Sequence, residues 1–229
     1  MVLSPVFFIA FLGGVLPALL WLFFWLFEDR CEPEPKRYIF FSFFAGMAVV
    51  WPVLFLERSV VPFASGATLL LIWAFIEEAC KFGAAYLAAL HWHVFDEPLD
   101  AVIYLVTVAL GFSALENTLF LMGPLEQGDV LKTIVTGDLR FIGATLLHTL
   151  SSATIGVALA VSFYKPAAIR RKAALIGVVL ATLLHTFFNF FILQEGGGAT
   201  FWLFLTIWFG VIVILLFTER IKQPARDYC

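Results

Sequence analysis

Long apolar runs alternate with short polar stretches along the whole chain. Because the hydrocarbon core of a bilayer is about 30 Å thick, a helix needs about 20 apolar residues to cross it. Seven stretches meet this requirement: residues 3–27, 38–56, 67–90, 99–122, 140–163, 173–193 and 200–217. The pattern therefore predicts an all-α polytopic membrane protein with about seven transmembrane helices.

The seven helices are expected to form a single membrane domain over residues 1–229, because no loop between them is long enough for a second domain. The first apolar run is too long for the core of a signal peptide, so we interpret it as a retained helix. The active site is expected in a central four-helix core, residues 67–193. Residues 1–60 and 200–217 would supply peripheral helices, and residues 218–229 a cytoplasmic tail.

The composition agrees with a membrane protein. The 229 residues are 62% hydrophobic and 14% charged, whereas soluble domains carry about 25% charged residues. A soluble fold of this size could not bury so much apolar surface. The formal net charge of −3 shows no bias toward nucleic acid. The lipid bilayer is therefore an expected partner, and nucleic acid is not.

Lysine and arginine are distributed unevenly between the two sides of the membrane. One side would hold ten of them: Arg30, Lys36, Arg37, Lys165, Arg170, Arg171, Lys172, Arg220, Lys222 and Arg226. The other side would hold three, which are Arg58, Lys132 and Arg140. The positive-inside rule then places the N-terminus outside the cell membrane and the C-terminus in the cytoplasm, which requires an odd number of spans.

Polar side chains gather in the four central spans. They are Glu77, Glu78, Lys81, Glu116, Asn117, His148, His185 and Asn189. A charge at the bilayer centre costs about 3 kcal/mol or more, so such residues usually face the bundle interior and mark a functional site. A structural ion pair between Glu77 and Lys81, four residues apart, would account for only one carboxylate. The whole set therefore predicts a site.

The depths of these residues point to one layer of the membrane. At a rise of 1.5 Å per residue, Glu77 lies about 15 Å from the expected outer end of its helix. The same estimate places His148 and His185 about 12 Å deep, and Glu116 about 9 Å deep. We therefore expect the polar groups to meet in the outer half of the bilayer.

Hydrolysis of a peptide bond needs an activated water molecule, a base that takes its proton and a stabiliser for the oxyanion. Glu77 and Glu78 are adjacent, and Lys81 can reach either one. If Lys81 holds one glutamate ionised, the two carboxyl groups can divide the roles of base and acid. The spacing does not decide which glutamate is the base. Asn189 shares a helix face with His185 and could donate a hydrogen bond to the oxyanion.

Glu116, His148 and His185 together supply the donor types that hold catalytic zinc, so we expect them to be the metal ligands. Bound zinc lowers the pKa of its water molecule to about 7. The spacing leaves open whether the water is bound to a metal ion or is held by glutamate and histidine alone. Zinc is the expected cofactor if a metal is bound.

Four short motifs occur in order: IEEACK (76–81), GFSALEN (111–117), RFIGATLLH (140–148) and HTFFN (185–189). They resemble the PrsW family of intramembrane proteases, which belongs to the wider group of CAAX prenyl proteases and bacteriocin-processing enzymes. DEPLDAVIY (96–104) is also similar to this family. The resemblance implies a glutamate-dependent membrane endopeptidase, often described as a metalloprotease.

The resemblance also carries residue roles and a substrate class. It implies catalytic roles for Glu77 and Glu78 with Lys81, and a role for Glu116 with the later histidines. The eukaryotic prenyl proteases have an arginine one position after Lys81 and a histidine where Glu116 stands, which argues against prenylated substrates here. The founding member of the family acts on a membrane-anchored anti-sigma factor, so a membrane-anchored protein is the expected substrate.

Two other functions fit part of the pattern. Buried carboxylates and histidines also form proton relays in ion-coupled transporters. Transporters typically break their helices with glycine or proline at the binding site, but the four central stretches contain no proline. A catalytically inactive scaffold that binds a single-span partner is the third interpretation, and the complete motif set argues against it.

A few further residues have simpler interpretations. Cys80 is expected to be a small apolar residue and not a nucleophile. His91 and His93 are expected to lie at a surface, in a loop away from the polar layer. Asp100 is expected to cap the helix that it starts. Arg140 is expected to contact lipid headgroups, with an ion pair to Glu116 as the alternative.

Overall fold

The computed structural model describes residues 5–28, 33–192 and 198–221. Within these ranges, eight α-helices follow one another: α1 (Pro5–Glu28), α2 (Lys36–Val60), α3 (Gly66–Ala85), α4 (Asp100–Glu126), α5 (Val130–Leu139), α6 (Thr145–Val161), α7 (Ala167–Ile192) and α8 (Gly198–Ile221). Two π-helical turns accompany them: η1 (Tyr86–Leu90) continues α3, and η2 (Arg140–Ala144) joins α5 to α6.

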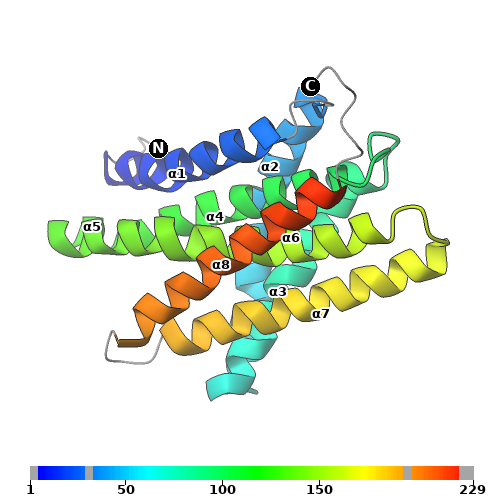
Figure 1. The fold of residues 1–229 in the computed structure, drawn as a ribbon. Helices are drawn as coiled ribbons and strands as arrows, with labels where there is room; N and C mark the ends of the chain where they lie inside the picture. Colours follow the sequence, from blue (N-terminus) through cyan, green and yellow to red (C-terminus); the bar gives the residue numbers. More distant parts are fainter. Residues whose placement is uncertain (1–4, 29–32, 193–197, 222–229) are drawn as a thin grey trace.

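Helices α4 and α6 form the centre of the bundle (Figure 1). Every side chain from Asp100 to Ala114 in α4 is buried, as is every side chain from Thr145 to Ala153 in α6. A helix that is buried on all sides has no polar face, which explains why these segments read as continuous apolar runs. Polar side chains on such helices must therefore find partners inside the protein.

The other helices pack around this centre. Helices α1 and α2 pack against α4, whereas α7 packs against both α3 and α6, and α8 covers α6. In Figure 1, α4, α6 and α7 run across the view, and α2 and α3 cross them steeply. This crossing brings the middle of α3 close to α6 and α7, where the polar residues of three helices can meet.

The expected all-α polytopic fold is confirmed. Within the described ranges, six helices are long and apolar enough to cross a membrane: Pro5–Phe27, Lys36–Val60, Asp100–Glu126, Val130–Val161, Ala167–Ile192 and Phe201–Ile221. The seventh expected span, residues 67–90, is helical as α3 and η1. It carries Glu77, Glu78 and Lys81, so it fails a criterion based on apolar composition alone.

One boundary differs clearly from the expectation. The span expected at residue 140 begins at Val130 as α5, and none of the residues of α5 is buried. Asp129 starts this helix, because its side chain accepts a hydrogen bond from the backbone N–H of Lys132 at 2.9 Å. The depth expected for His148 was counted from residue 140, which lies inside this helical segment and is not its start. Of the expected tail 218–229, α8 continues to Ile221 and the remainder lies outside the described residues.

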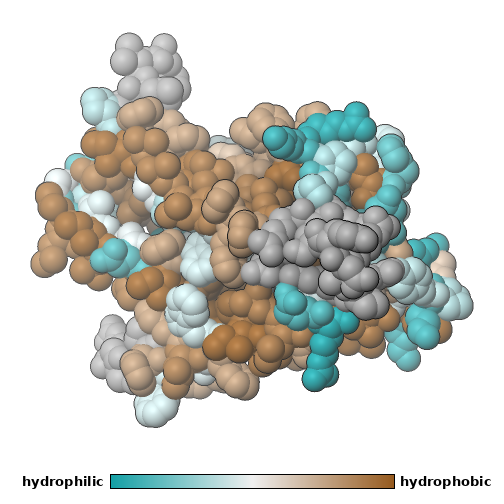
Figure 2. Space-filling model, turned by 45° about the horizontal axis from the view of Figure 1, so that its top comes forward, coloured by the Kyte–Doolittle hydropathy of each residue, from teal (hydrophilic) through white to brown (hydrophobic). Residues whose placement is uncertain are grey.

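The outer surface is that of a protein surrounded by lipid. Figure 2 shows apolar side chains over most of the visible face, with hydrophilic residues gathered toward one side. Phe23, Phe55 and Leu87 are among many large apolar side chains that are more than two-thirds exposed. Exposed apolar surface of this extent is costly in water, so the fold is that of a multi-pass membrane protein.

Close backbone contact between α2 and α4 depends on two glycines. A Cβ atom on Gly46 would collide with the backbone oxygen of Val108, and one on Gly111 would collide with the backbone oxygen of Phe43. These are backbone atoms, so they cannot move aside as a flexible side chain would. The contact fixes the position of α4, which carries Glu116.

We predict that Gly111→Ala lowers the free energy of unfolding by about 1–3 kcal/mol, because it overpacks the α2–α4 contact. Gly123→Ala is the matched control on the same helix, since nothing lies within 4 Å of its added Cβ. The control should be neutral or stabilising by up to about 1 kcal/mol. Thermal unfolding in detergent measures both, and equal effects of the two changes would contradict this account of the packing.

Candidate active site

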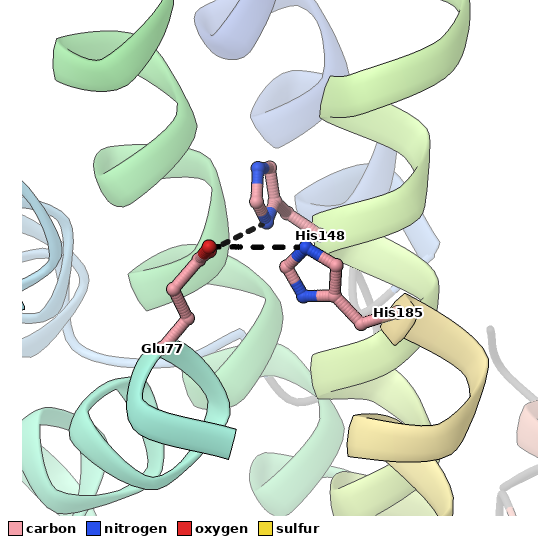
Figure 3. Close-up of side chains that lie close together, drawn as sticks. All are labelled: Glu77, His148 and His185. Atoms are coloured by element: carbon pink, nitrogen blue, oxygen red, sulfur yellow. Dashed lines mark ion pairs between the residues drawn. The ribbon is translucent and has the colours of Figure 1, made fainter. Parts of the chain in front are cut away.

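Glu77, His148 and His185 meet between three helices, α3, α6 and α7 (Figure 3). Glu77 Oε2 lies 3.8 Å from His148 Nδ1, and Glu77 Oε1 lies 3.9 Å from His185 Nε2. The two imidazole rings lie edge to face, with centroids 5.1 Å apart. All three side chains are buried, with at most 6% of each residue exposed.

Glu78 and Lys81 lie beside His185. Glu78 Oε1 accepts a hydrogen bond from Lys81 Nζ at 2.7 Å and contacts His185 Nδ1 at 2.8 Å. A carboxylate can only accept, so Nδ1 of His185 carries the proton of this bond. In the neutral ring, Nε2 is then the nitrogen with a free lone pair, and it is the one that faces Glu77.

Glu116 and Arg140 lie on the other side of His148. Arg140 Nη2 forms an ion pair with Glu116 Oε2, and the same oxygen lies 3.0 Å from His148 Nε2. Lys81 Nζ lies 3.0 Å from His148 Nδ1. An ammonium group can only donate, so Nδ1 accepts from Lys81 and Nε2–H donates to Glu116. Each histidine is thus held by its own carboxylate, and each of these carboxylates by its own cation.

A polar network anchors Arg140. Its Nε donates to Asn117 Oδ1 at 2.5 Å, and its guanidinium lies 3.9 Å from the centroid of the Phe120 ring. Asn117 in turn donates to Ser113 Oγ at 3.2 Å and to Thr145 Oγ1 at 3.0 Å. For Arg140 the sequence predicted contact with lipid headgroups, with an ion pair to Glu116 as the alternative, and the structure contains this ion pair. Ser113 was not foreseen, although its place four residues before Asn117 indicates a shared helix face.

Glu57 also belongs to the cluster, and sequence reasoning missed it because the second span was expected to end at residue 56. It lies near the end of α2, partly buried, and its carboxyl group is within electrostatic range of those of Glu77 and Glu116. Trp73 Nε1 donates to the backbone oxygen of Glu57 at 3.2 Å and so fixes it against α3. The signal was a carboxylate one residue beyond an apolar run.

The charges of the cluster suit a bound cation. Glu57, Glu77, Glu78 and Glu116 supply four carboxyl groups. Lys81 and Arg140 supply two permanent cations. The carboxyl groups therefore outnumber the permanent cations by four to two. In agreement, Glu77 Oε2 and Glu78 Oε2 are buried without a hydrogen-bond partner among the described residues.

Among the described residues, three side chains could hold a metal ion: Glu77, His148 and His185, whose ligand atoms all lie within 4.8 Å of one another. The sequence had assigned Glu116 to this set in place of Glu77. In the structure Glu116 lies at Nε2 of His148, on the side of the ring away from Nδ1 and Glu77. Lys81 donates to His148 Nδ1 and therefore competes with a metal ion for that nitrogen.

The remaining expected residues lie outside this cluster. Asn189 is partly buried on α7, one turn after His185, and no hydrogen bond joins it to the cluster in the described part of the chain. Cys80 packs with the apolar residues around Val50. His91 lies exposed in the loop after η1.

The prediction that Asp100 caps its helix is wrong. Its Oδ2 atom accepts hydrogen bonds from the backbone N–H groups of Asp96 and Glu97, both at 2.9 Å, and so holds the preceding loop.

Buried carboxylates and histidines of this kind, between the helices of a polytopic membrane protein, are typical of a functional site within the membrane. The family model described as PrsW family intramembrane metalloprotease matches residues 34–217, which include the whole cluster. The chain belongs to this family. It is an intramembrane protease that acts on protein substrates within a membrane, and this membership favours proteolysis over the transporter and scaffold interpretations.

Individual relatives agree with the family assignment. The chain is 26% identical over 182 residues to Protease PrsW of Bacillus subtilis (strain 168), covering 78% of this chain and 80% of that protein. It is 31% identical over 114 residues to Protease PrsW of Geobacillus kaustophilus (strain HTA426), covering 48% and 51%. It is 25% identical over 221 residues to Protease PrsW of Shouchella clausii (strain KSM-K16), covering 94% and 96%. No solved structure matches the chain significantly.

We predict that Lys81→Met lowers the free energy of unfolding by about 3–5 kcal/mol, because it leaves the fully buried Glu78 without its cation. Adding Glu78→Gln in the same chain should recover part of the loss, since the unpaired charge is then removed. Lys132→Met, at an exposed position on α5, is the control and should change little. Chemical unfolding in detergent measures all three. A loss in Lys81→Met that Glu78→Gln makes larger would contradict the ion-pair account.

Proposed function

We propose that the protein cleaves a membrane-anchored protein at the cluster formed by Glu77, His148 and His185, and that these three side chains hold a divalent metal ion. The observation that carries the proposal is the convergence of three ligand atoms within 4.8 Å in a buried site with an excess of carboxyl groups over permanent cations. One carboxylate and two imidazoles are the donor set of many catalytic zinc sites, so zinc is the proposed metal.

A bound zinc ion would supply an activated water molecule and a Lewis acid for the scissile carbonyl group. The protein's own residues supply the proton transfers. Glu78 is proposed as the base, because Lys81 and His185 bind its Oε1 and leave the buried Oε2 free to accept a proton. Asn189, one turn after His185, is proposed as the hydrogen-bond donor to the oxyanion.

The substrate is proposed to be a membrane protein similar to an anti-sigma factor and not a prenylated one. The residues in the positions that distinguish prenyl proteases, Lys81 and Glu116, support this choice. Cleavage is proposed near the outer side of the cell membrane, with the N-terminus outside and the C-terminus in the cytoplasm. The distribution of lysine and arginine supports this orientation, with α3 proposed as a seventh span beside the six helices that are apolar enough to cross a membrane.

The metal site is tested by exchanging side chains of the cluster one at a time. We predict that Glu77→Gln and His185→Gln each abolish metal binding and lower cleavage by at least about a hundredfold, because each removes a ligand. Glu116→Gln should retain the metal with weaker affinity. Glu126→Gln, exposed at the end of α4, is the control and should resemble the unaltered protein.

The measurements are zinc content of the detergent-purified protein and cleavage of a reconstituted single-span substrate. Equal metal content in Glu77→Gln and the unaltered protein, with metal lost in Glu116→Gln, would restore Glu116 as the ligand and overturn the proposed set. Activity that persists without bound metal and in the presence of a strong chelator would leave the route in which Glu and His alone hold the water.

The orientation is tested by chemical labelling of single cysteines in intact cells. We predict that Lys132→Cys on α5 reacts with a membrane-impermeant maleimide from outside, whereas Lys165→Cys, between α6 and α7, reacts only after the cells are permeabilised. Both labelling experiments use a chain whose native cysteines are replaced by serine. The opposite labelling pattern would reverse the proposed orientation.

A further inference from the structure

We propose that Arg140 is a positioning residue for the reaction, which acts on His148 through Glu116. The inference rests on the proposed function, since it concerns how one of the proposed ligands is oriented. The arginine touches neither Glu77 nor His185 in the described contacts. Its role would be to fix Glu116 so that this carboxylate holds His148 with Nδ1 toward Glu77.

The contacts form a relay of two links, the first from Arg140 to Glu116 and the second from Glu116 to His148. The guanidinium of Arg140 is paired with Glu116 Oε2, and this same oxygen lies 3.0 Å from Nε2 of His148. A hydrogen bond from one imidazole nitrogen to a carboxylate determines which nitrogen is left for a ligand. Glu116 thereby commits Nε2 of His148 and leaves the lone pair of Nδ1, which accepts from Lys81 at 3.0 Å and lies 3.8 Å from Glu77 Oε2. Figure 3 marks this ion pair between Glu77 and His148.

Glu116 needs Arg140 to hold this position. The Glu116 side chain is 18% exposed and that of Arg140 is 15% exposed, whereas the side chains of Glu77, Lys81 and His148 are at most 8% exposed. The ion pair of Arg140 and Glu116 thus lies at the edge of the cluster. If Arg140 were removed, Glu116 would lose its cation while the carboxyl groups of Glu57 and Glu77 still repel it, so its side chain would tend to turn outward, away from His148.

The shape of an arginine side chain suits this role. Nε donates to Asn117 Oδ1 and Nη2 binds Glu116, so one planar group holds the side chains of two consecutive residues of α4. The ring of Phe120 covers its face. A lysine at the same place could neutralise Glu116, but a single ammonium does not reproduce this two-point fork.

The backbone around Arg140 is also unusual. Arg140 is the first residue of the π-helical turn η2, and Thr145 directly after the turn binds Asn117 at 3.0 Å. Single π-turns within α-helices frequently occur at functional sites. The turn lets Arg140 reach α4 while the following helix α6 keeps His148 in the cluster, so both ends of the relay are carried by one continuous helical segment.

The test compares Arg140→Met, Arg140→Lys, Glu116→Gln and the double variant Arg140→Met with Glu116→Gln, and uses Lys132→Met as the control. Zinc affinity of the metal-free protein is measured by calorimetry, and kcat and KM are measured on a reconstituted substrate. Arg140→Met should weaken zinc binding by about 10–100-fold and lower kcat with little change in KM. Arg140→Lys should recover only part of the lost affinity, because an ammonium neutralises Glu116 without also holding Asn117. Lys132→Met should match the unaltered protein.

The double variant decides between a relay and an independent role. If Arg140 acts through Glu116, adding Arg140→Met to Glu116→Gln causes no further loss of affinity or kcat. Losses that multiply in the double variant, or an Arg140→Met protein with unaltered affinity and kcat, overturn the proposal. If Arg140→Met does not fold, Arg140→Lys and Glu116→Gln are compared in the same way, and a failure of lysine to do better than Glu116→Gln overturns it.

A failure of the proposed metal site gives a different result. If the unaltered protein binds no zinc and a chelator leaves its activity unchanged, the ligand assignment is wrong. The relay is then judged from kcat alone: a non-additive loss in the double variant supports the positioning role of Arg140, and an additive loss overturns it.

Discussion

Charge compensation inside the helix bundle is the constraint on which the site depends. Four carboxyl groups lie together among spanning helices, where an isolated charge is costly. Lys81 and Arg140 each bind one of these carboxylates, and each of those two carboxylates binds one histidine. The result is two short chains of cation, carboxylate and imidazole that flank Glu77. The excess of carboxyl groups over permanent cations is what makes the centre suitable for a metal ion.

This arrangement explains why the central helices are so tightly buried. Breaking a buried ion pair by removing one partner is strongly destabilising, so the helices that carry the partners must keep their relative positions. Glycine contacts hold α2 against α4, and the hydrogen bonds among Ser113, Asn117 and Thr145 hold α4 against the segment that leads into α6. The apolar surface around this core meets lipid, which lets a small protein enclose a polar reaction site.

Much of the site could be foreseen because charged and amide residues are rare in spanning helices. Glu77, Glu78, Lys81, Glu116, His148 and His185 all stand out in apolar runs, and all six lie in one cluster. Glu57 was missed, since it stands at the end of a span where polar residues are ordinary. The start of α5 was missed as well, because an exposed helix with polar residues resembles a loop in its composition.

The sequence by itself determined the class of protein, a fold of about seven helices and most of the polar residues that cluster between them, because hydrocarbon excludes unpaired polar groups wherever they occur in the chain. Only the tertiary structure decided which carboxylate faces which side of each imidazole. Helix α4 is buried all round, so no polar face in its sequence indicates the direction in which Glu116 points. The rotation of α4 and the crossing of α3 arise from packing against other helices. They place Glu77 at the centre and Glu116 beside Arg140 at the edge.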